Sequence, residues 1–418
     1  MRHEDLSRGS ARPATSRTLV IQAGARHGYA FPAMLAEADR LAFFQTTTAL
    51  AAGQSPGPAM VLASRVFSRL RAALARRRAP LAPDLLAVAP GPDILRAGCR
   101  VTGAGHMRAR LAQNAALGRA ALVSSARWPR PTSLLAVDGG GGAAALARFR
   151  RSGVPIIVDI AVTPTALRTV ADAARRHPDW ADGAPSEREI RRFEEHYARL
   201  VAVADWIFYP STAVLQGLET IPGFDPARAR EVPYPVARSG APATATEPGR
   251  VLFVGSDPLR KGLPDLAPSI RMAAVPLHLV VAGQLPRALC AHPDLCGATL
   301  LGHVPAARLA AEYARADILV LPSLAEGMPA VAVEAMAAGV PVVATQAAGT
   351  PVVHGVSGLI VPPNNPQALA HAMTKIVGDR GRRAQMSDAA RRRAEAYRPE
   401  SVARILLDAL DHVEGGRS

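Results

Sequence analysis

Short runs of aliphatic and β-branched residues alternate with longer helical patterns along almost the whole chain. In the first half these runs occupy residues 18–24, 41–47, 133–139, 154–160 and 205–211, and helical patterns lie between them. A strand, a helix and a second strand in this order form a βαβ unit, whose two strands pair in parallel. The alternation therefore predicts an α/β fold in which helices cover parallel sheets.

A stretch of small and polar residues, 238–249, interrupts the pattern near the middle of the chain, and its Pro and Gly content is typical of a linker. Beyond it the alternation restarts. We expect strands at 250–255, 277–283, 298–302, 317–323, 341–345 and 358–362, and helices from Gly262 and at 305–315, 330–338 and 366–377. The sequence therefore predicts two Rossmann-like, doubly wound domains, at 17–237 and 250–380.

Two such domains joined by one linker would face a central cleft, and open parallel sheets bind ligands beyond the carboxyl ends of their strands. We therefore predict a site in that cleft. The remaining helical stretches, in 381–418, are expected to cross back to the first domain. Residues 335–353 carry no charge, but two prolines and two glycines interrupt them, so no membrane-spanning helix is expected there.

Charge and cysteine content indicate the kind of partner and the cellular compartment to expect. The 418 residues include 49 Lys and Arg against 34 Asp and Glu, and the formal charge of +15 favours anionic partners. The arginines are dispersed without interleaved aromatic residues, so nucleic acid is not an expected partner. Three cysteines without a CxxC pair, and a charged amino terminus without an apolar core, predict a protein of the reducing cytoplasm.

Two glutamates after one predicted strand are the most informative polar residues. Glu326 lies in a Gly/Pro loop directly after the strand at 317–323, and Glu334 lies eight residues later in a helix. Pro329 marks the start of that helix, whose first backbone amides are free to bind an anion. Carboxylates beside an anion site suit a ligand that carries hydroxyls and phosphates, such as a nucleotide sugar. For either glutamate taken alone, a solvated side chain is the favoured interpretation.

The segment EGMPAVAVEAMAAGVPVVAT, 326–345, resembles the Glu-x7-Glu signature of family 4 (group 1) glycosyltransferases, a retaining family with the GT-B fold. VLFVGSDPLRKGLPDL, LVVAGQLP and GVSGLIVPPNNPQALAHAM follow in the order expected of the family's carboxyl-terminal half, so the resemblance covers 250–377. In the first half, GARHGYAFPAML, 24–35, is similar to the family's glycine-containing loop after the first strand. The resemblance implies a GT-B architecture.

The resemblance also implies roles for matching residues. Lys261 matches the lysine that contacts the donor diphosphate, Glu326 the glutamate that binds donor-sugar hydroxyls, and Glu334 the glutamate usually paired with the ribose. The loop that surrounds the sugar and phosphate matches Gly327, Met328, Pro329 and Ala330. The loop on the acceptor side matches Gly24, His27, Gly28 and Tyr29. Catalytic roles are implied for Lys261, Glu326 and His27.

The donor site departs from the family pattern at one position. Many members carry an arginine straight after the glycine that ends the strand matching 250–255, whereas this chain has Ser256. Arg260, next to Lys261, supplies the missing charge if its side chain turns the same way. We therefore include Ser256 and Arg260 in the predicted donor site.

A second departure lies in the first domain. Related enzymes often have a histidine in the loop after the strand matching 154–160, and this chain has none there. His27 and His106 are the candidate substitutes, although a lone histidine is more often structural.

Residues 58–80 form a basic amphipathic pattern, with Val66, Phe67, Leu70 and Leu74 on one helical face. Such a helix either packs its apolar stripe on the first sheet, which we favour, or lies on anionic lipid headgroups. The second alternative implies peripheral contact with the inner face of the cell membrane.

The resemblance implies an enzyme that moves a sugar, with retention, from a nucleotide-diphosphate donor to a hydroxyl of a glycan or lipid-linked acceptor, as in bacterial polysaccharide or glycolipid synthesis. The chain has no Asp-x-Asp motif, so neither a metal nor another cofactor is expected. Two alternatives remain. A GT-B nucleotide-sugar epimerase would need no acceptor, and a non-catalytic subunit that binds nucleotide sugar would tolerate the two departures.

Overall fold

The structure is a computed structural model, and it describes residues 16–54, 77–101, 106–181, 183–236 and 246–415. The chain divides into two compact units, of which the first contains residues 1–104 and 109–157 and the second contains 105–108 and 158–418. Most of the predicted linker at 238–249 and of the predicted helix at 58–80 lies outside the described residues. The domain boundaries predicted from the sequence stay a prediction.

Two sheets form within the part of the chain that the structure describes. The first contains β1 (Thr18–Gln22), β2 (Leu41–Thr46), β3 (Leu86–Val88), β4 (Ser133–Val137), β5 (Ile156–Asp159), β6 (Trp206–Tyr209) and β7 (Ala229–Glu231). The second contains β8 (Arg250–Val254), β9 (His278–Ala282), β10 (Thr299–Gly302), β11 (Ile318–Leu321), β12 (Val342–Thr345) and β13 (Gly358–Val361).

The order of the strands is that of doubly wound sheets. It is β3-β2-β1-β4-β5-β6-β7 in the first sheet and β10-β9-β8-β11-β12-β13 in the second. The strand β1 pairs in parallel with β2 and β4, and β8 pairs in parallel with β9 and β11. The predicted α/β class with parallel sheets is therefore confirmed.

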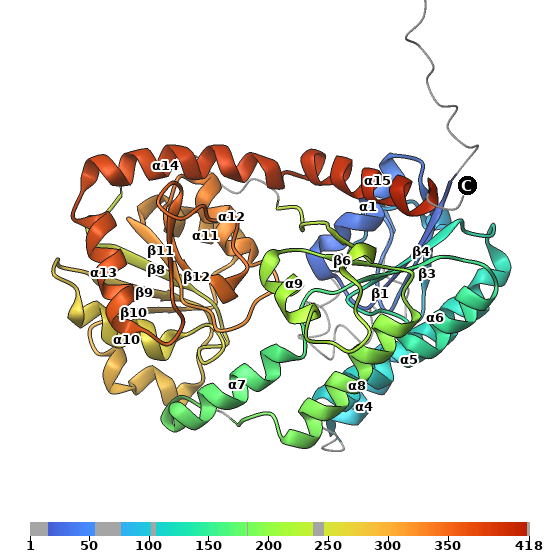
Figure 1. Cartoon of the computed structure of the whole chain (residues 1–418), viewed down its shortest axis with the longest axis horizontal. Coiled ribbons are helices and arrows are strands. Elements are labelled where there is room, and N and C mark those ends of the chain that lie inside the picture. The colour runs from blue at the N-terminus through green and yellow to red at the C-terminus, as the bar shows by residue number, and fades with distance from the viewer. Residues whose placement is uncertain (1–15, 55–76, 102–105, 182, 237–245, 416–418) are drawn as a thin grey trace, which may run out of the picture. The chain divides into compact units, whose positions relative to one another are not determined.

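Helices fill most of the connections between strands (Figure 1). Those before residue 157 are η1 (Arg26–Tyr29), α1 (Ala30–Glu37), η2 (Pro83–Leu85), α4 (Gly91–Val101), α5 (His106–Ser124), η3 (Ser125–Arg127) and α6 (Gly142–Arg151). Those up to the second sheet are α7 (Thr165–Arg176), η4 (Pro178–Trp180), α8 (Glu187–Val203), α9 (Thr212–Leu218) and η5 (Pro226–Arg228). The rest are α10 (Leu263–Met272), η6 (Arg287–Ala291), η7 (Pro293–Leu295), α11 (Ala306–Arg315), α12 (Ala330–Ala337), η8 (Gln346–Ala348), α13 (Pro366–Val377), α14 (Arg380–Ala394), η9 (Glu395–Tyr397) and α15 (Pro399–Gly415).

Each strand predicted from the sequence matches an observed strand, and its two ends agree to within two residues. Sequence reasoning missed β3 and β7, which are edge strands of three residues each. The strand β7 contains Arg230 and Glu231, so it has no apolar run from which a strand could be predicted. Residues 335–353 form the end of α12, the strand β12 and loops, as expected.

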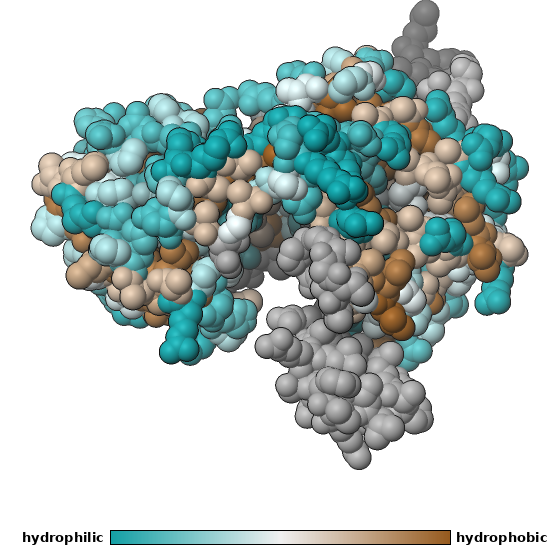
Figure 2. All heavy atoms as spheres, turned by 90° about the horizontal axis from the view of Figure 1, so that it is seen from below, coloured by the Kyte–Doolittle hydropathy of each residue, from teal (hydrophilic) through white to brown (hydrophobic). Residues whose placement is uncertain are grey.

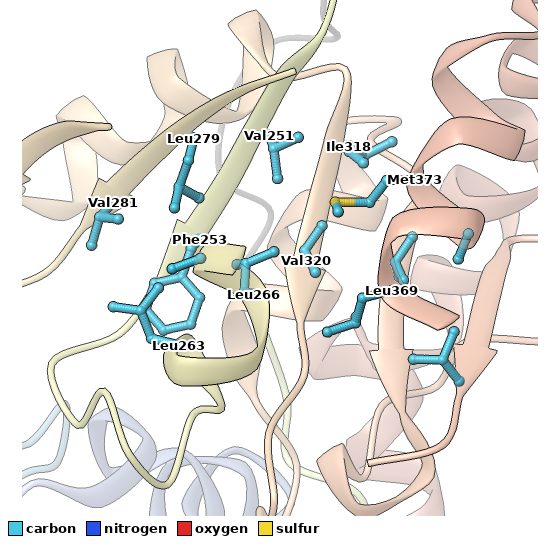
Figure 3. Close-up of a cluster of buried hydrophobic side chains, with 14 of the residues drawn as sticks. Val251, Phe253, Leu263, Leu266, Leu279, Val281, Ile318, Val320, Leu369 and Met373 are labelled. Atoms are coloured by element: carbon cyan, nitrogen blue, oxygen red, sulfur yellow. The ribbon is translucent and has the colours of Figure 1, made fainter. Parts of the chain in front are cut away.

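A buried cluster between the six-stranded sheet and helices α10 and α13 forms the core of that region (Figure 3). Alternate residues of a strand point to one face, so Val251 and Phe253 of β8 both belong to this cluster, and Phe253 lies beside Leu263 of α10. The neighbouring strand β11 contributes Ile318 and Val320 in the same way. Each fully buried side chain of this kind contributes about 1.5–3 kcal/mol. The core thus fixes the carboxyl ends of β8 and β11, where the polar residues of interest follow.

The last two long helices contact both sheets. Ser387 of α14 donates a hydrogen bond to the carbonyl oxygen of Gly339, 2.6 Å away, at the end of α12. The backbone nitrogen of Val236 donates to the carbonyl oxygen of Tyr397 at 2.9 Å. In α15, the His412 ring lies 5.0 Å from that of Trp206 in β6. These contacts tie the chain end to β6 and to the segment that follows β7, within the second unit.

Exposed hydrophobic residues are scattered over the surface. The face in Figure 2 shows them as small patches among hydrophilic side chains. Ile94 and Val123 are the most exposed large hydrophobic residues of those described, each at 70%. None of the described helices combines the length and the apolar character needed to cross a membrane.

A substitution at Gly262 tests whether the loop after β8 needs a residue without a side chain at this position. Its φ is 74°, and a Cβ at this position would lie 2.0 Å from the backbone oxygen of Pro322. We expect Gly262→Ala to lower the free energy of unfolding by about 3 kcal/mol, because a left-handed conformation and a backbone clash act together. Gly223→Ala is the matched control, since its φ is 80° with nothing within 4 Å, and it should cost about 1 kcal/mol. Equal losses in urea denaturation would contradict this account.

Candidate functional site

The loop after β8 holds Lys261 against the end of its own strand. The backbone nitrogen of Lys261 donates to the carbonyl oxygen of Asp257 at 3.0 Å, which closes the turn. A Cβ at Gly255 would lie 3.1 Å from Cγ of Lys261, so the lysine stem packs over this glycine. Only 11% of the Lys261 side chain is exposed. The ammonium group is therefore fixed in place rather than free in solvent.

Lys261 points at the first of the two predicted glutamates. Its Nζ lies 2.7 Å from Oε1 of Glu326, whose side chain is 12% exposed. The two residues follow β8 and β11, which are neighbours in the sheet. Residues 65 positions apart in the sequence thus meet because parallel strands end at the same edge.

Arg260 turns to the same carboxylate. Its Nη1 donates to Oε1 of Glu326 and, at 3.0 Å, to the carbonyl oxygen of Ala325, while its Nε donates to Oδ2 of Asp257 at 2.8 Å. Burial alone would lower the pKa of the Arg260 guanidinium, but Glu326 and Asp257 outweigh it and raise that pKa, so the group stays charged. Arg260 and Lys261 therefore converge on one oxygen atom of Glu326.

Ser256 occupies a different place in this loop. Its Oγ accepts a hydrogen bond from the backbone nitrogen of Gln284, 3.2 Å away, after β9. The side chain therefore joins two loops at the edge of the sheet and adds no charge. Arg260 is the second cation of the cluster.

The loop from Glu326 to the start of α12 has little freedom. The backbone nitrogen of Glu326 donates to Ala347 at 3.0 Å, and Ser211 donates its hydroxyl proton to the carbonyl oxygen of Gly327 at 2.5 Å. A Cβ at Gly327 would lie 2.0 Å from the backbone oxygen of Ala161, so a larger residue does not fit. Met328 is buried, and α12 begins at Ala330 directly after Pro329. The helix α12 thus begins four residues after Glu326, and the first amides of a helix have no acceptor one turn earlier within it.

The second glutamate has a partner that sequence reasoning missed. The hydroxyl of Tyr313, in α11, donates to Oε2 of Glu334 at 2.8 Å. Tyr313 is fully buried, and burial together with the Glu334 charge raises the pKa of its hydroxyl, so it remains a proton donor. The sequence gave no signal for this contact, because Tyr313 lies 21 residues before Glu334, in a different helix.

A cavity of about 360 Å³ adjoins Glu326 in the second unit. Its wall contains hydroxyl and amide side chains that sequence reasoning did not single out as a group, namely Thr163, Thr165, Thr169, Gln216 and Gln346. The hydroxyls of Thr163 and Thr165 lie 2.8 Å apart. These groups suit a ligand rich in hydroxyls.

The carboxyl-terminal part of the chain matches a known family. Residues 248–379 match the family described as Glycosyl transferases group 1. This segment is therefore similar to the group 1 glycosyltransferases. The resemblance stated from the motifs is thereby confirmed for residues 248–379, which include Lys261, Glu326 and Glu334.

Curated relatives match parts of the chain. The D-inositol 3-phosphate glycosyltransferase of Xylanimonas cellulosilytica is 34% identical over 170 residues, which cover 38% of this chain and 41% of that protein. The glycogen synthase of Mycobacterium tuberculosis is 30% identical over 248 residues, which cover 54% of this chain and 56% of that protein. The chain thus spans between two fifths and three fifths of the length of these relatives.

Solved structures match almost the entire chain. The sucrose-phosphate synthase of Thermosynechococcus elongatus superposes with a TM-score of 0.62 at 16% identity, over 96% of this chain and 100% of that one. HepE of Anabaena, in complex with UDP and glucose, gives a TM-score of 0.59 at 15% identity, over 95% and 100%. The predicted GT-B fold class is therefore confirmed, whereas the predicted central cleft stays a prediction.

The predicted acceptor-side loop lies in the first unit, after β1. Gly24 and Gly28 have φ of 72° and 62°, and a Cβ at either would meet nothing within 4 Å. His27 follows the same turn with a φ of 49°. Tyr29 is buried with its ring 5.5 Å from that of Phe44, and burial raises the pKa of its hydroxyl to about 12. The roles predicted for these residues stay predictions, and the side chain of His106 lies outside the described residues.

Metal ligands do not cluster in the part of the chain that the structure describes. No group of three or more His, Cys, Asp and Glu side chains there is placed to hold a metal ion. The charges that surround Glu326 come instead from Lys261 and Arg260.

Because Lys261 and Arg260 share the Glu326 carboxylate, we expect this residue to contribute to the stability of the protein without any ligand. Glu326→Gln leaves the largely buried Lys261 without its counter-charge and leaves Arg260 paired with Asp257 alone, and we expect a loss of about 2 kcal/mol in the free energy of unfolding. Glu195→Gln removes a carboxylate from an exposed pair with Arg199, whose side chains are 62% and 68% exposed, and should cause no measurable loss. Urea denaturation at pH 7 makes the comparison. Two indistinguishable midpoints would show that the cluster around Glu326 does not stabilise the loops.

Proposed function

We propose that the chain is a glycosyltransferase that moves a sugar from a nucleotide-diphosphate donor to a hydroxyl acceptor, with retention and without a metal. The observation that carries this proposal is the contact of 2.7 Å between Nζ of Lys261 and Glu326. In this contact a cation meets a carboxylate that lies four residues before the start of α12. Such a set matches the phosphates and hydroxyls of a nucleotide sugar.

Donor binding exchanges the partners of this cluster. The diphosphate takes Lys261 and Arg260 as counter-ions, and Glu326 is released to accept hydrogen bonds from the sugar hydroxyls. The first turn of α12, with Gly327 to Ala330 before and at its start, faces the sugar and phosphate. Glu334, held by Tyr313, binds the ribose hydroxyls.

The reaction forms a bond between the acceptor oxygen and the anomeric carbon and breaks the bond from that carbon to the phosphate oxygen. The electron pair leaves with the diphosphate, where Lys261 and Arg260 stabilise the added negative charge. The acceptor approaches from the face on which the phosphate departs, and the departing phosphate oxygen takes its proton. Two protein cations supply the charge that a metal would supply, so no metal is needed. His27, on the acceptor-side loop, is the proposed histidine of the reaction centre.

The relatives suggest which substrates to try first. The names of two curated relatives refer to inositol 3-phosphate and to glycogen, which are both rich in hydroxyls, and the HepE structure is a complex with UDP and glucose. We therefore propose a UDP-sugar as the first donor to test and a glycan or lipid-linked glycan as the acceptor class. We further propose that the enzyme works in the cytoplasm at the inner face of the cell membrane.

The two lysines of the chain provide a matched test of the donor site. Lys261→Ala should weaken nucleoside diphosphate binding by ten- to a hundredfold, and Arg260→Ala by about tenfold, because each removes a charge-assisted contact. Lys375→Ala is the control, since Lys375 is exposed in α13 and should leave binding unchanged. Calorimetric titration with UDP, GDP, ADP and TDP measures the dissociation constants, and a parallel set with a chelator tests metal independence. Unchanged binding in Lys261→Ala would contradict the assignment of the site.

Turnover by the wild-type protein separates the transferase from its alternatives. Release of nucleoside diphosphate that depends on an added membrane or glycan extract supports the transferase. Interconversion of donor sugars without acceptor would identify an epimerase, and donor binding without any turnover would identify a non-catalytic subunit.

Tyr313 tests the role of Glu334. Tyr313→Phe removes the hydrogen bond to Oε2 of Glu334, so the carboxylate loses its fixed orientation. We expect KM for the donor to rise about five- to tenfold with kcat within twofold, because the ribose contact acts on the ground state and the transition state alike. Tyr397→Phe, which removes a hydroxyl that accepts from Arg393, serves as the control and should leave KM unchanged. A wild-type KM in a stably folded Tyr313→Phe variant would refute the positioning role.

A further inference from the structure

The first unit contains a cavity of about 600 Å³ that none of the predicted roles uses. It is bounded by the end of α5, by η3 and by the end of α6. Pro131, just before β4, and Val154, just before β5, line its inner side. The cavity therefore lies at the edge of the sheet where β4 begins.

That edge is opposite to the one where the acceptor-side loop lies. The strands β1 and β4 run parallel, with Thr18 opposite Ser133 and Gln22 opposite Val137. The acceptor-side loop follows the carboxyl end of β1, whereas the cavity precedes the amino end of β4. Its occupant is therefore a ligand other than the hydroxyl that receives the sugar.

Three arginines from three separate segments line this cavity. Arg119 is on α5, Arg130 precedes β4 and Arg148 is on α6, and all three are exposed. Arg130 donates to the carbonyl oxygen of Ser152. Of the described residues that line the cavity none is acidic, and no ion pair with a described carboxylate involves any of the three.

Some other arginines of the same unit, in contrast, have a counter-charge. Arg110, for example, pairs with Asp138 at 2.7 Å, and Arg17 pairs with Asp39 at 2.9 Å. Three guanidinium groups around one cavity repel one another, and a bound anion removes that repulsion. Phosphate is the anion whose oxygen atoms best match the planar guanidinium donors.

Part of the cavity wall is apolar. Leu122 and Val123 of α5 line it together with Trp128, and Val123 is 70% exposed. The indole of Trp128 stacks on Phe43 at 5.1 Å with the planes 13° apart, so it forms a rigid wall. When only an inorganic anion is bound, this apolar surface stays exposed to water. An acyl or prenyl chain attached to the phosphate would cover it.

We propose that this cavity, formed by Arg119, Arg130, Arg148, Leu122, Val123 and Trp128, binds the phosphate headgroup of a membrane lipid. The three arginines hold the phosphate, and the apolar wall receives the first carbons of the lipid chain. The site anchors the first unit to an anionic membrane surface and leaves the opposite edge of its sheet free for the acceptor. It does not depend on the proposed sugar transfer.

Vesicle flotation of the full chain tests the proposal. Vesicles of phosphatidylcholine with phosphatidylglycerol are compared with vesicles of phosphatidylcholine alone. The triple variant Arg119→Gln, Arg130→Gln, Arg148→Gln should bind the anionic vesicles at least tenfold more weakly than wild type. The charge-matched control is Arg188→Gln, Arg308→Gln, Arg404→Gln, three exposed arginines of the second unit, and it should stay within twofold of wild type. Residues 58–80 are the same in every variant, so any contribution from them cancels.

Two further arms identify the source of the phosphate and the part played by the apolar wall. Val123→Ser, at an exposed position, should weaken vesicle binding about threefold with all charges kept. Glycerol 3-phosphate at millimolar concentration should not displace wild type from the vesicles. Equal binding by the triple variant and its control would overturn the site. Full displacement by glycerol 3-phosphate, or vesicle binding by Val123→Ser equal to that of wild type, would contradict a lipid ligand. Either result would indicate a site for a free phosphate ester.

Discussion

One carboxylate oxygen, Oε1 of Glu326, holds two cations that would otherwise repel each other. Lys261 and Arg260 are neighbours in the sequence, and both side chains turn to this atom across the edge of the six-stranded sheet. Without the carboxylate, the loops after β8 and β11 would carry unbalanced positive charge in a largely buried place. The glycines at 255 and 262 and the core beneath the two strands serve this arrangement, because they bring the loops within reach of each other.

The same arrangement prepares the site for an anion. A diphosphate brings at least as much negative charge as Glu326 supplies, so it can replace the carboxylate without leaving either cation unpaired. The exchange then frees Glu326 beside the amino terminus of α12, where a sugar with hydroxyl groups fits. In the proposed function the ion pair is thus a resting state of the donor site, and it keeps Lys261 and Arg260 oriented before the donor arrives.

The sequence predicted the fold well because the alternation of buried strands and helices is a local and strong signal. The strands from β8 to β13 and the loop positions of Lys261, Glu326 and Glu334 followed from it, and the motifs then indicated the family. It could not predict the direction of the Arg260 side chain, since adjacent side chains need not point the same way. Tyr313 was missed because its contact with Glu334 depends on how α11 and α12 lie against each other. The edge strand β3 was missed because it has only three residues, and β7 because it is as short and also lacks an apolar run. The arginine cavity was missed because its members come from three segments.

A structure of the protein with a nucleotide sugar bound would test the central claim most directly. We predict that Nζ of Lys261 and the guanidinium of Arg260 lie about 3 Å from diphosphate oxygens, and that the Glu326 carboxylate has moved to accept hydrogen bonds from the sugar hydroxyls. A diphosphate bound elsewhere, with the contact between Lys261 and Glu326 intact, would contradict the account.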